Sequence, residues 1–512
     1  MKKGSSILKS TFIIMVVSLI SRGLGFVRDI LVTKNFNIGI NTDAYSIAIG
    51  IPDTIFTLIG LAIATSFLPT LSRIRNEKSQ KDMYKFANNI INILFIISIF
   101  VFILCFINAS YIVQIFASKN LQKETQVLAV FLTRITIINI MFLSINACFT
   151  ALLQMNEDFV IPSILGLFFN FPMILYLVLF RNFDITGLAV ANVIGNFLRV
   201  VVQIPSLLKH NYKYQFIIDF KDENVKKIIY LIIPVVIGAG ANSINMVVDK
   251  NLAASLHRSG SISALEFSQK LVFFINNIVT ASVTSIIYPL MANRLNEGKM
   301  DEFVTLIKKS VIYVFIFLMP IGIGISILGK DVVKAVYFMD ENGMSLTSSA
   351  LIGYGIGTSF TAVRDILNST LFSMGKTKIT AINGIIGVII NIILSIVMSK
   401  HMGIIGITLA SSIAMAVTQF LLFISIIKIN KKIELNDIIK KMMLIILNSI
   451  IMGILVFVMY LFLKNYISKS LMRLVICSIV GIIVYFVSSN VLKIDEIDEI
   501  VGLIKKKIRR EV

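Results

Sequence analysis

Long apolar runs alternate with short polar breaks along almost the whole chain of 512 residues. A helix needs about twenty apolar residues to cross a bilayer, and runs of about that length recur about fourteen times here. The pattern therefore predicts an all-α polytopic membrane protein of about fourteen transmembrane helices. The predicted spans are residues 11–33, 43–71, 87–108, 126–154, 159–180, 187–208, 229–255, 262–291, 311–329, 349–373, 380–399, 404–427, 442–463 and 474–492.

The second half of the chain repeats features of the first half at an offset of about 220 residues. Asp29 then aligns with Asp249, and Pro69 aligns with Pro289. The repeat pairs the first six predicted helices with the next six, so both halves should share one orientation and bind substrate between them. The predicted domains are an N-lobe at 1–228, a C-lobe at 229–430, and two further helices with a basic cytoplasmic tail at 431–512.

Composition supports the membrane class, because 56% of the residues are hydrophobic, only 15% are charged, and the mean hydropathy is +0.88. The formal net charge of +20 comes mostly from Lys and Arg in alternate loops, which is the orientation signal of membrane proteins. We therefore expect both termini in the cytoplasm and no nucleic-acid partner. The outer loops are short and leave no room for an external catalytic domain, so an enzyme is not expected.

The first apolar run carries three charges, on Arg22, Arg28 and Asp29. A charge near the middle of a membrane helix costs several kcal/mol unless it faces a polar cavity or a partner. One interpretation is a cationic, water-lined cavity that binds an anionic group, with Asp29 moderating the positive charge. The alternative is an Arg28 and Asp29 pair that closes on a neighbouring helix.

Charges in the other predicted helices allow two interpretations each. Lys270 fits a cavity role, but Glu266 precedes it by four residues and can form an intrahelical pair with it. Asp249 lies on a polar helix face and is expected in the cavity. Asp43 suits either a gate or a helix cap. Two more charges are expected to act as a gate, as an inter-helix pair or in direct substrate contact: Arg364 and Asp365.

Two further expectations concern proline and arginine in the first half. Pro52, with Asp53 beside it, is expected to kink the second helix. Arg199 lies near the cytoplasmic end of the sixth helix and is expected to extend its side chain to the membrane surface. The three cysteines and three histidines are too scattered for a metal site, and the chain has no glycine-rich phosphate loop for ATP. No cofactor is therefore expected.

Several segments resemble the MurJ (MviN) family of lipid II flippases, within the multidrug, oligosaccharidyl-lipid and polysaccharide exporter superfamily. The most specific are Ser21-Arg22 with Leu24-Gly25-Phe26-Val27-Arg28-Asp29, Thr42-Asp43-Ala44-Tyr45, Ile51-Pro52, Phe67-Leu68-Pro69, Gly260-Ser261-Ile262-Ser263-Ala264-Leu265 and Gly375-Lys376-Thr377. The resemblance covers nearly the whole chain.

The resemblance implies a V-shaped cavity between two six-helix lobes in the cytoplasmic membrane of a bacterium. Lipid II, the undecaprenyl-diphosphate-linked peptidoglycan precursor, would cross from the cytoplasmic to the outer leaflet by alternating access. The essential cavity arginines of the family map onto Arg22 and Arg28, and the neighbouring acid maps onto Asp29. Lys270 stands where the family has an arginine. Membrane lipids and the cell-wall synthesis machinery are the other expected partners.

Some members of the family resemble sodium-coupled transporters, and the nearest positions here are Asp249, Asn391 and Ser411. Ser395 stands where an acid would be expected, which weakens this assignment; membrane potential is the other candidate energy source. A flippase for another lipid-linked oligosaccharide or polysaccharide is the main alternative. A drug or cation antiporter should have an acidic cavity, and a membrane glycosyltransferase should have catalytic carboxylates in larger outer loops.

Overall fold

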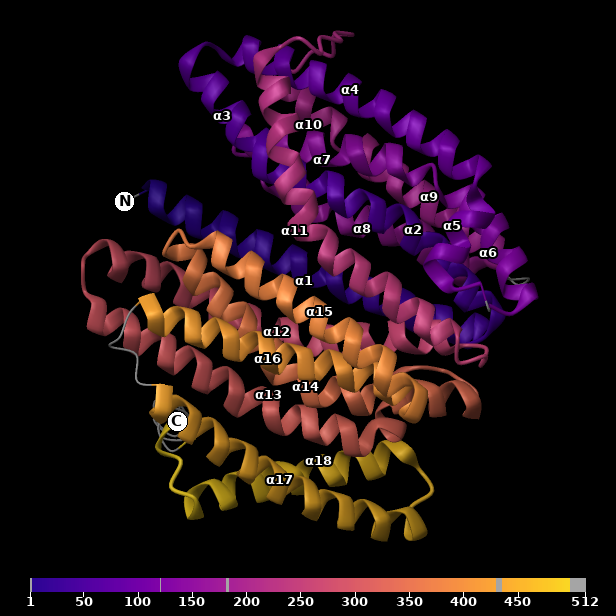
Figure 1. Ribbon diagram of the computed structural model, residues 1–512, viewed down its shortest axis with the longest axis vertical. Helices are drawn as coiled ribbons and strands as arrows, with labels where there is room; N and C mark the ends of the chain where they lie inside the picture. The colour runs from indigo at the N-terminus through magenta and orange to yellow at the C-terminus, as the bar shows by residue number, and fades with distance from the viewer. Residues whose placement is uncertain (1, 120, 181–183, 430–434, 498–512) are drawn as a thin grey trace. The chain divides into compact units, whose positions relative to one another are not determined.

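Helices joined by short connections build the computed structural model, which describes residues 2–119, 121–180, 184–429 and 435–497 and has no strand among them (Figure 1). The helices of the first half are α1 (Lys2–Phe36), α2 (Ile40–Ala62), the π-helical turn η1 (Ile63–Phe67), α3 (Leu68–Glu77), α4 (Gln80–Ile107), α5 (Ala109–Ala117), α6 (Lys123–Thr136), α7 (Asn139–Met155), α8 (Val160–Leu179), α9 (Ile185–Val201), α10 (Ile204–Lys209) and α11 (Glu223–Ala254). Those of the second half are α12 (Ser261–Asn296), α13 (Met300–Val336), α14 (Glu341–Ser373), α15 (Thr377–Met402), α16 (Ile404–Ile429), α17 (Leu435–Tyr466) and α18 (Ser470–Val491).

The chain divides into two compact units, unit 1 at residues 1–263 and unit 2 at residues 264–512. The sequence had placed the division after residue 228. The difference arises because α11 packs against α2 and α5 of the first half. Lys250 Nζ on α11 donates to the carbonyl oxygen of Ser46 at 3.1 Å, and Asn251 Nδ2 donates to that of Ile115 at 3.2 Å. The first helix of the predicted C-lobe is therefore part of unit 1.

In unit 1, α8 packs between α1 and α9, and small residues allow close approach on both sides. A Cβ atom on Gly166 of α8 would overlap the Ser21 hydroxyl of α1. A Cβ atom on Gly195 of α9 would overlap the carbonyl oxygen of Phe169 on α8. These contacts fix α1, α8 and α9 as one tightly packed layer, on which the polar groups described below are mounted.

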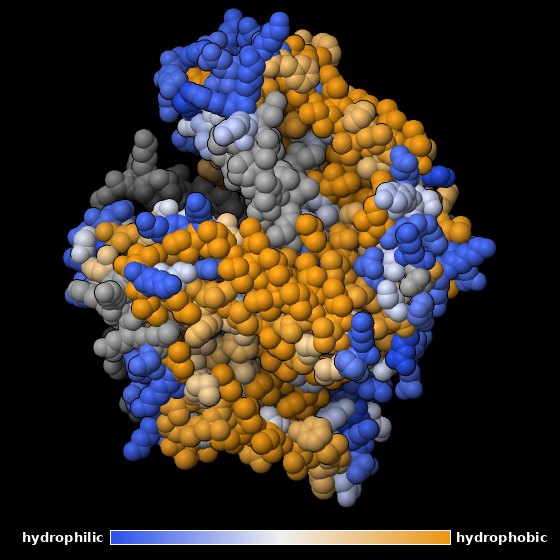
Figure 2. All heavy atoms as spheres, viewed as in Figure 1, coloured by the Kyte–Doolittle hydropathy of each residue, from blue (hydrophilic) through white to orange (hydrophobic). Residues whose placement is uncertain are grey.

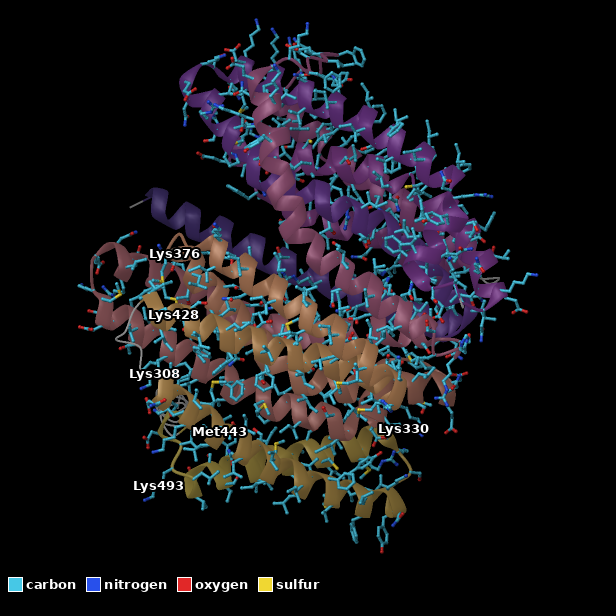
Figure 3. All side chains as sticks on the ribbon, in the orientation of Figure 1. Lys308, Lys330, Lys376, Lys428, Met443 and Lys493 are labelled. Atoms are coloured by element: carbon cyan, nitrogen blue, oxygen red, sulfur yellow. The ribbon has the colours of Figure 1, made fainter. Side chains whose placement is uncertain are left out.

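In unit 2, α14 packs between α13 and α16, α15 covers α16, and both α17 and α18 pack against α13. A large apolar core that includes Phe303, Phe315 and Leu367 joins these helices. Hydrophobic side chains cover the middle of the unit 2 helices in Figure 2, with hydrophilic ones toward the helix ends. Figure 3 places four lysines at one end of unit 2, with Lys330 at the other; the four are Lys308, Lys376, Lys428 and Lys493.

Eight helices among the described residues are long and apolar enough to cross a membrane, or nine if the pair α6 and α7 is one bent span. The prediction of an all-α polytopic membrane protein is confirmed. Every predicted span coincides with a helix or a pair of helices, but the number of fourteen crossings stays a prediction. Residues 498–512 of the predicted tail lie outside the described residues.

Three of the predicted helices are interrupted at places that the sequence did not indicate, and one of them, 187–208, consists of α9 and α10. Pro52 lies inside α2, which continues past it and gives way to the π-helical turn at Ile63–Phe67, and the kink expected at Pro52 stays a prediction. The span predicted at residues 126–154 consists of α6 and α7, bent by 41° at their junction.

Candidate functional site

Arg28 and Asp29 of α1 form an ion pair in unit 1. Arg28 Nη2 lies 2.8 Å and Nε lies 3.1 Å from Asp29 Oδ1. The Arg28 side chain is only 16% exposed and that of Asp29 only 9%. Arg28 Nη1 also donates to Asn170 Oδ1 on α8 at 3.0 Å, and Asn170 Nδ2 donates to the Gly166 carbonyl at 2.8 Å. This is the geometry of the second interpretation, an Arg28 and Asp29 pair that closes on a neighbouring helix, and the cationic, water-lined cavity stays a prediction.

A second arginine, Arg199 of α9, lies beside this pair. The guanidinium carbons of Arg199 and Arg28 lie 3.9 Å and 5.7 Å from the centre of one ring, that of Phe169 on α8. Arg199 Nη1 also donates to Asn196 Oδ1 at 3.2 Å. Asp53 interacts electrostatically with Arg199. The structure therefore turns Arg199 onto α8, whereas the sequence had suggested that it extends to the membrane surface. We call Arg28, Asp29, Phe169, Asn170 and Arg199 the arginine cluster.

The other cation predicted in α1, Arg22, is exposed and lies six residues before Arg28. At a rise of about 1.5 Å per residue, the two Cα atoms are separated by about 9 Å along the helix. A chain of amides continues the polar region beyond Arg199: Asn196 Nδ2 donates to the Asn192 carbonyl at 3.3 Å, and Asn139 Nδ2 donates to Asn192 Oδ1 at 2.9 Å. Unit 1 thus holds a partly buried region that carries positive charge and hydrogen-bonding groups.

Asp43 has a capping geometry. Its Oδ2 accepts from the Gly260 N–H at 2.7 Å, and its Oδ1 accepts from the Ser263 N–H at 2.8 Å and the Ser263 hydroxyl at 2.7 Å. Asp43 is only 3% exposed. Of the two roles open from the sequence, the geometry is that of a structural carboxylate, but the helix it caps is α12 and not its own α2. Asp249 of α11 is also buried, at 9% exposure.

The charges predicted in unit 2 form local pairs. Lys270 Nζ lies 2.8 Å from Glu266 Oε1 one turn earlier, and 5.3 Å from the centre of the Phe267 ring. Arg364 Nη2 lies 2.7 Å from Asp365 Oδ1, and Arg364 Nη1 lies 2.8 Å from the sulfur of Met415 on α16. The Lys270 side chain is 32% exposed, so it pairs with Glu266 and still reaches the surface of unit 2.

Two of the three residues proposed for a sodium site, Asn391 and Ser411, lie in unit 2 and are hydrogen-bonded to each other. Asn391 Nδ2 donates to Ser411 Oγ at 2.9 Å, and Ser395 Oγ donates to Asn391 Oδ1 at 3.4 Å. Asp249 belongs to unit 1. Among the described residues, no three His, Cys, Asp or Glu side chains are grouped to hold a metal ion.

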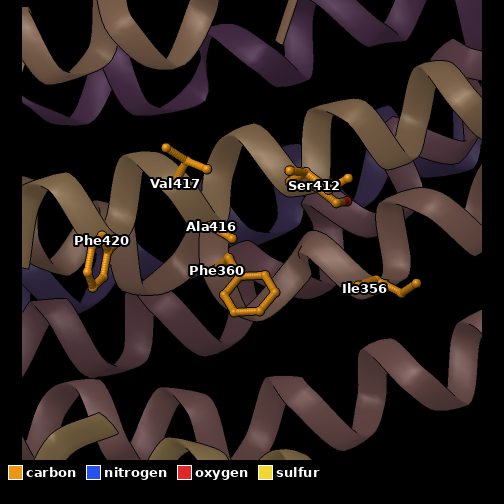
Figure 4. A pocket seen from close by; sticks show the side chains of 7 residues that line it. Ile356, Phe360, Ser412, Ala416, Val417 and Phe420 are labelled. Carbon is orange, nitrogen blue, oxygen red and sulfur yellow. The ribbon is translucent and has the colours of Figure 1, made fainter. Parts of the chain in front are cut away.

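An apolar cavity of about 340 Å³ lies between α14 and α16 (Figure 4). Ile356 and Phe360 of α14 line one side. The other side comes from α16, and its lining residues are Ser412, Ile413, Ala416, Val417 and Phe420. The cavity offers one hydroxyl and otherwise only hydrocarbon, so its chemistry suits an apolar chain and not a charged group.

Sequence reasoning missed Phe169 and Asn170, and it misjudged Arg199. Asn170 stands alone in the apolar stretch Leu165-Gly166-Leu167-Phe168-Phe169-Asn170-Phe171. A buried amide in such a stretch needs a hydrogen-bonding partner on another helix, and this was the available signal. Phe169 gave no such signal in the sequence, because phenylalanine is common in the apolar runs of this chain. Its role became visible only when α1 and α9 were seen to meet at α8.

These observations define a polytopic helical membrane protein that holds paired charges and amides inside its helical units, as transporters of charged substrates do. A model of the lipid II flippase MurJ family matches residues 32–477. The chain therefore belongs to the lipid II flippase MurJ family, and the resemblance found in the sequence is confirmed.

Curated relatives and solved structures agree with this assignment. The probable lipid II flippase MurJ of Buchnera aphidicola subsp. Schizaphis graminum is 27% identical over 524 residues, covering 98% of this chain and 100% of the relative. The lipid II flippase MurJ of Thermosipho africanus is 28% identical over 491 residues, covering 95% and 97%. A solved lipid II flippase MurJ in an inward closed conformation matches with a TM-score of 0.79 at 26% identity, covering 95% of this chain and 100% of that one.

More distant solved structures share the fold. An inward-facing multidrug resistance MATE family transporter of the MOP superfamily matches with a TM-score of 0.65 at 14% identity, covering 81% of this chain and 96% of that one. At this identity the likeness concerns the arrangement of helices alone.

Proposed function

We propose that this protein is a lipid II flippase, which moves the undecaprenyl-diphosphate-linked peptidoglycan precursor from the cytoplasmic to the outer leaflet of a bacterial cell membrane. The observation that carries the proposal is Arg28, held inside unit 1 by Asp29 and Asn170 in a chain of the MurJ family. The reaction is transport, and no bond of the substrate is made or broken.

The arginine cluster has the chemistry that a diphosphate requires. A diphosphate cannot enter hydrocarbon without groups that replace its water. A guanidinium presents a planar set of donors that matches phosphate oxygens, and such charge-assisted hydrogen bonds are about twice as strong as neutral ones. Asp29 and Asn170 orient the Arg28 guanidinium in advance, so less side-chain freedom is lost when the diphosphate binds. Arg22 and Arg199 would add positive charge nearby.

Alternating access and membrane potential complete the proposed mechanism. Each elementary charge that crosses 100 mV gains about 2.3 kcal/mol, so a conformational change that carries net charge responds to the potential. Sodium coupling is the weaker option, because Ser395 stands where an acid would be expected. We place both termini in the cytoplasm, because the Lys and Arg residues gather in alternate loops.

The test is a lipid II translocation assay in cells depleted of their own flippase. The parent protein should restore translocation, and Arg28→Ala at equal abundance should lose most of it. Arg134→Ala is the matched control, because Arg134 also lies over a phenylalanine ring, Phe106 at 5.8 Å, but outside the arginine cluster. Full translocation by Arg28→Ala would refute the cationic site. Lys270→Ala tests the predicted contribution of unit 2 separately.

The same assay addresses the main alternative. If an abundant and folded parent fails to translocate lipid II, the substrate is another lipid-linked glycan, since the same cluster would bind any prenyl diphosphate. The cells should then be supplied with lipid-linked oligosaccharides and polysaccharide precursors in turn. A contribution of the cell-wall synthesis machinery stays a prediction.

A further inference from the structure

Three asparagines of α4 hold the connection between α10 and α11 along the side of that helix. Each side-chain amide donates to one or two backbone carbonyls of the connection at 2.9–3.1 Å. The pairs are Asn88 with Lys213, Asn89 with Asp219, and Asn92 with both Gln215 and Ile217. Four carbonyls, on alternate residues of a segment without regular secondary structure, are therefore satisfied by side chains of one helix.

The amide oxygens of the same asparagines accept hydrogen bonds in return. Asn89 Oδ1 accepts from the Asp219 N–H at 2.7 Å, and Asn92 Oδ1 accepts from the Tyr214 hydroxyl at 2.7 Å. Asn88 Oδ1 accepts from the Tyr212 hydroxyl. Burial raises the pKa of Tyr212, so this hydroxyl stays protonated and donates. All three asparagines are at most 3% exposed, and they bind the connection as a fixed part of unit 1.

The held segment presents large apolar side chains outward. Tyr214, Phe216, Ile218 and Phe220 are 60%, 75%, 39% and 52% exposed. We call these four residues the apolar row. Tyr212 packs the start of the segment against α4: the centres of the Tyr212 and Tyr84 rings lie 5.4 Å apart, and the ring planes meet at 82°. The exposure of the row is therefore a property of a fixed segment and not of a loose loop.

The position of the segment along α4 matches the edge of the hydrocarbon layer. Asn92 follows Gln80, the first residue of α4, by twelve residues, which corresponds to about 18 Å along the helix. From Ile93 to the end of α4, all residues except Ser98 are apolar. The carbonyls of Gln215 and Ile217 are thus level with the end of the polar part of a membrane-spanning helix. Non-helical backbone is tolerated at that level only when its polar groups are bonded, as they are here.

Charges flank the apolar row. The lysines in and beside the segment are Lys209, Lys213, Lys221, Lys226 and Lys227, and the carboxylates are Asp219, Asp222 and Glu223. All five lysines are exposed. A row of exposed apolar side chains with lysines around it is the composition of segments that lie in the interface of a bilayer. The surplus of lysines favours anionic headgroups.

We propose that the segment from Asn211 to Phe220 is a membrane-interface anchor. Its apolar row inserts at the boundary between the headgroups and the acyl chains, in the leaflet on the side of the membrane where α3 and α10 lie. The asparagines of α4 make this possible by satisfying the backbone. The anchor would keep the first residues of α11 at a constant depth in the membrane during the transport cycle. The occupant of the row is lipid and not another protein.

The absence of tryptophan from the sequence provides a direct test. Phe216→Trp places the chain's single tryptophan in the row, where its emission can be excited apart from that of the tyrosines. Lys78→Trp and Ile103→Trp provide references in an exposed polar connection and on the exposed apolar face of α4. Each variant is reconstituted in vesicles of phosphatidylcholine and phosphatidylglycerol with brominated acyl chains. We expect fluorescence quenching in Phe216→Trp to exceed that in Lys78→Trp by about twofold or more and to approach that in Ile103→Trp.

A second variant tests the role of the asparagines. Asn92→Ala in the Phe216→Trp background should lower quenching by brominated lipid and raise quenching by aqueous iodide. Asn108→Ala is the control, because Asn108 bonds only to the Leu104 carbonyl of α4 itself among the contacts of its side chain in the structure. If the fluorescence of Phe216→Trp is quenched by iodide and not by brominated lipid, the anchor is refuted and a protein partner becomes the candidate occupant. Unchanged quenching in Asn92→Ala would refute the role of the asparagines.

Discussion

Arg473 of α18 donates two parallel hydrogen bonds to the carboxylate of Asp331 on α13. Arg473 Nη2 lies 2.7 Å from Asp331 Oδ1, and Nε lies 2.9 Å from Oδ2. The Asp331 side chain is 2% exposed and that of Arg473 is 12% exposed. Arg473 Nη1 also donates to the Ile467 carbonyl at 2.7 Å. The pair therefore ties the connection between α17 and α18, as well as α18 itself, to α13.

Breaking this pair should destabilise the docking of α17 and α18. Arg473→Ala leaves Asp331 charged in a buried position, and the loss of one partner of a buried pair costs about 3–5 kcal/mol. We expect a clear drop in the thermal unfolding temperature of the protein in detergent, and increased proteolysis at the connection between α17 and α18, which Arg473 holds through the Ile467 carbonyl. Arg294→Ala is the control, because its pairs with Glu297 and Glu302 are much more exposed.

The double replacement Asp331→Leu with Arg473→Met separates charge from packing. If the lost stability comes from an uncompensated charge, removing both charges should restore much of it. If the double variant is as unstable as Arg473→Ala, the hydrogen-bonded ion pair itself is needed to stabilise the packing of α18 on α13.

The cap formed by Asp43 predicts a second effect on stability. Gly260 has a backbone φ of +89°, and a Cβ atom there would overlap the side chain of Ile38. Gly260→Ala should therefore destabilise unit 1 by more than the roughly 1 kcal/mol of a left-handed backbone alone. Gly298 provides the matched control, because it has a φ of +71° and open space around its Cβ position. Equal unfolding temperatures for Gly260→Ala and Gly298→Ala would contradict this account.

Asp43→Asn tests the carboxylate of the same cap. The two carboxylate oxygens accept three hydrogen bonds, and an amide would present N–H groups to one of the donors. The loss should be about 1–3 kcal/mol in the free energy of unfolding. Translocation per folded molecule should stay close to that of the parent if the role of Asp43 is structural. A large loss of transport in a stably folded variant would instead favour the gate role.

Much of this fold could be predicted, because membrane helices follow from apolar length alone. The limits of that signal appear at the helix ends. α13 begins at Met300, eleven residues before its predicted start, because its first turns carry charges such as Lys308 that end an apolar run without ending a helix. The bend between α6 and α7 depends on tertiary packing, which leaves no mark on hydropathy.

The candidate site was predicted in part. Arg28 and Asp29 stood out because charges inside an apolar run need a reason. Their partners are set by which helices meet, and α1 meets α8 and not a helix next to it in sequence. Arg473 and Asp331 were missed for a related reason: each lies near the end of its helix, where a charge is ordinary. Only the structure shows that Asp331 is buried and paired with Arg473.

The shared ring of Phe169 predicts a role for Arg199 in transport. A desolvated cation over an aromatic ring gains about 2 kcal/mol, and Arg199 lies 3.9 Å from the ring centre. Arg199→Ala should lower lipid II translocation by about tenfold, equivalent to about 1.4 kcal/mol. Arg199→Lys should retain more activity, because the charge remains. Transport equal to that of Arg134→Ala would show that Arg199 serves only the packing of α9 on α8.

The glycines of α14 predict how closely α14 and α16 must approach. The Ser412 hydroxyl of α16 donates to the Gly353 carbonyl at 2.6 Å, and a Cβ atom on Gly353 would lie 2.6 Å from the backbone nitrogen of Leu409. Backbone cannot move aside as a side chain can, so Gly353→Ala must separate the helices and should lower the unfolding temperature of unit 2. Gly384→Ala in α15 is the control, because its Cβ position is open. Alanine there should be neutral or stabilise the helix by up to about 1 kcal/mol. If both variants unfold at the same temperature as the parent, close approach at Gly353 is not required for the stability of this pair of helices.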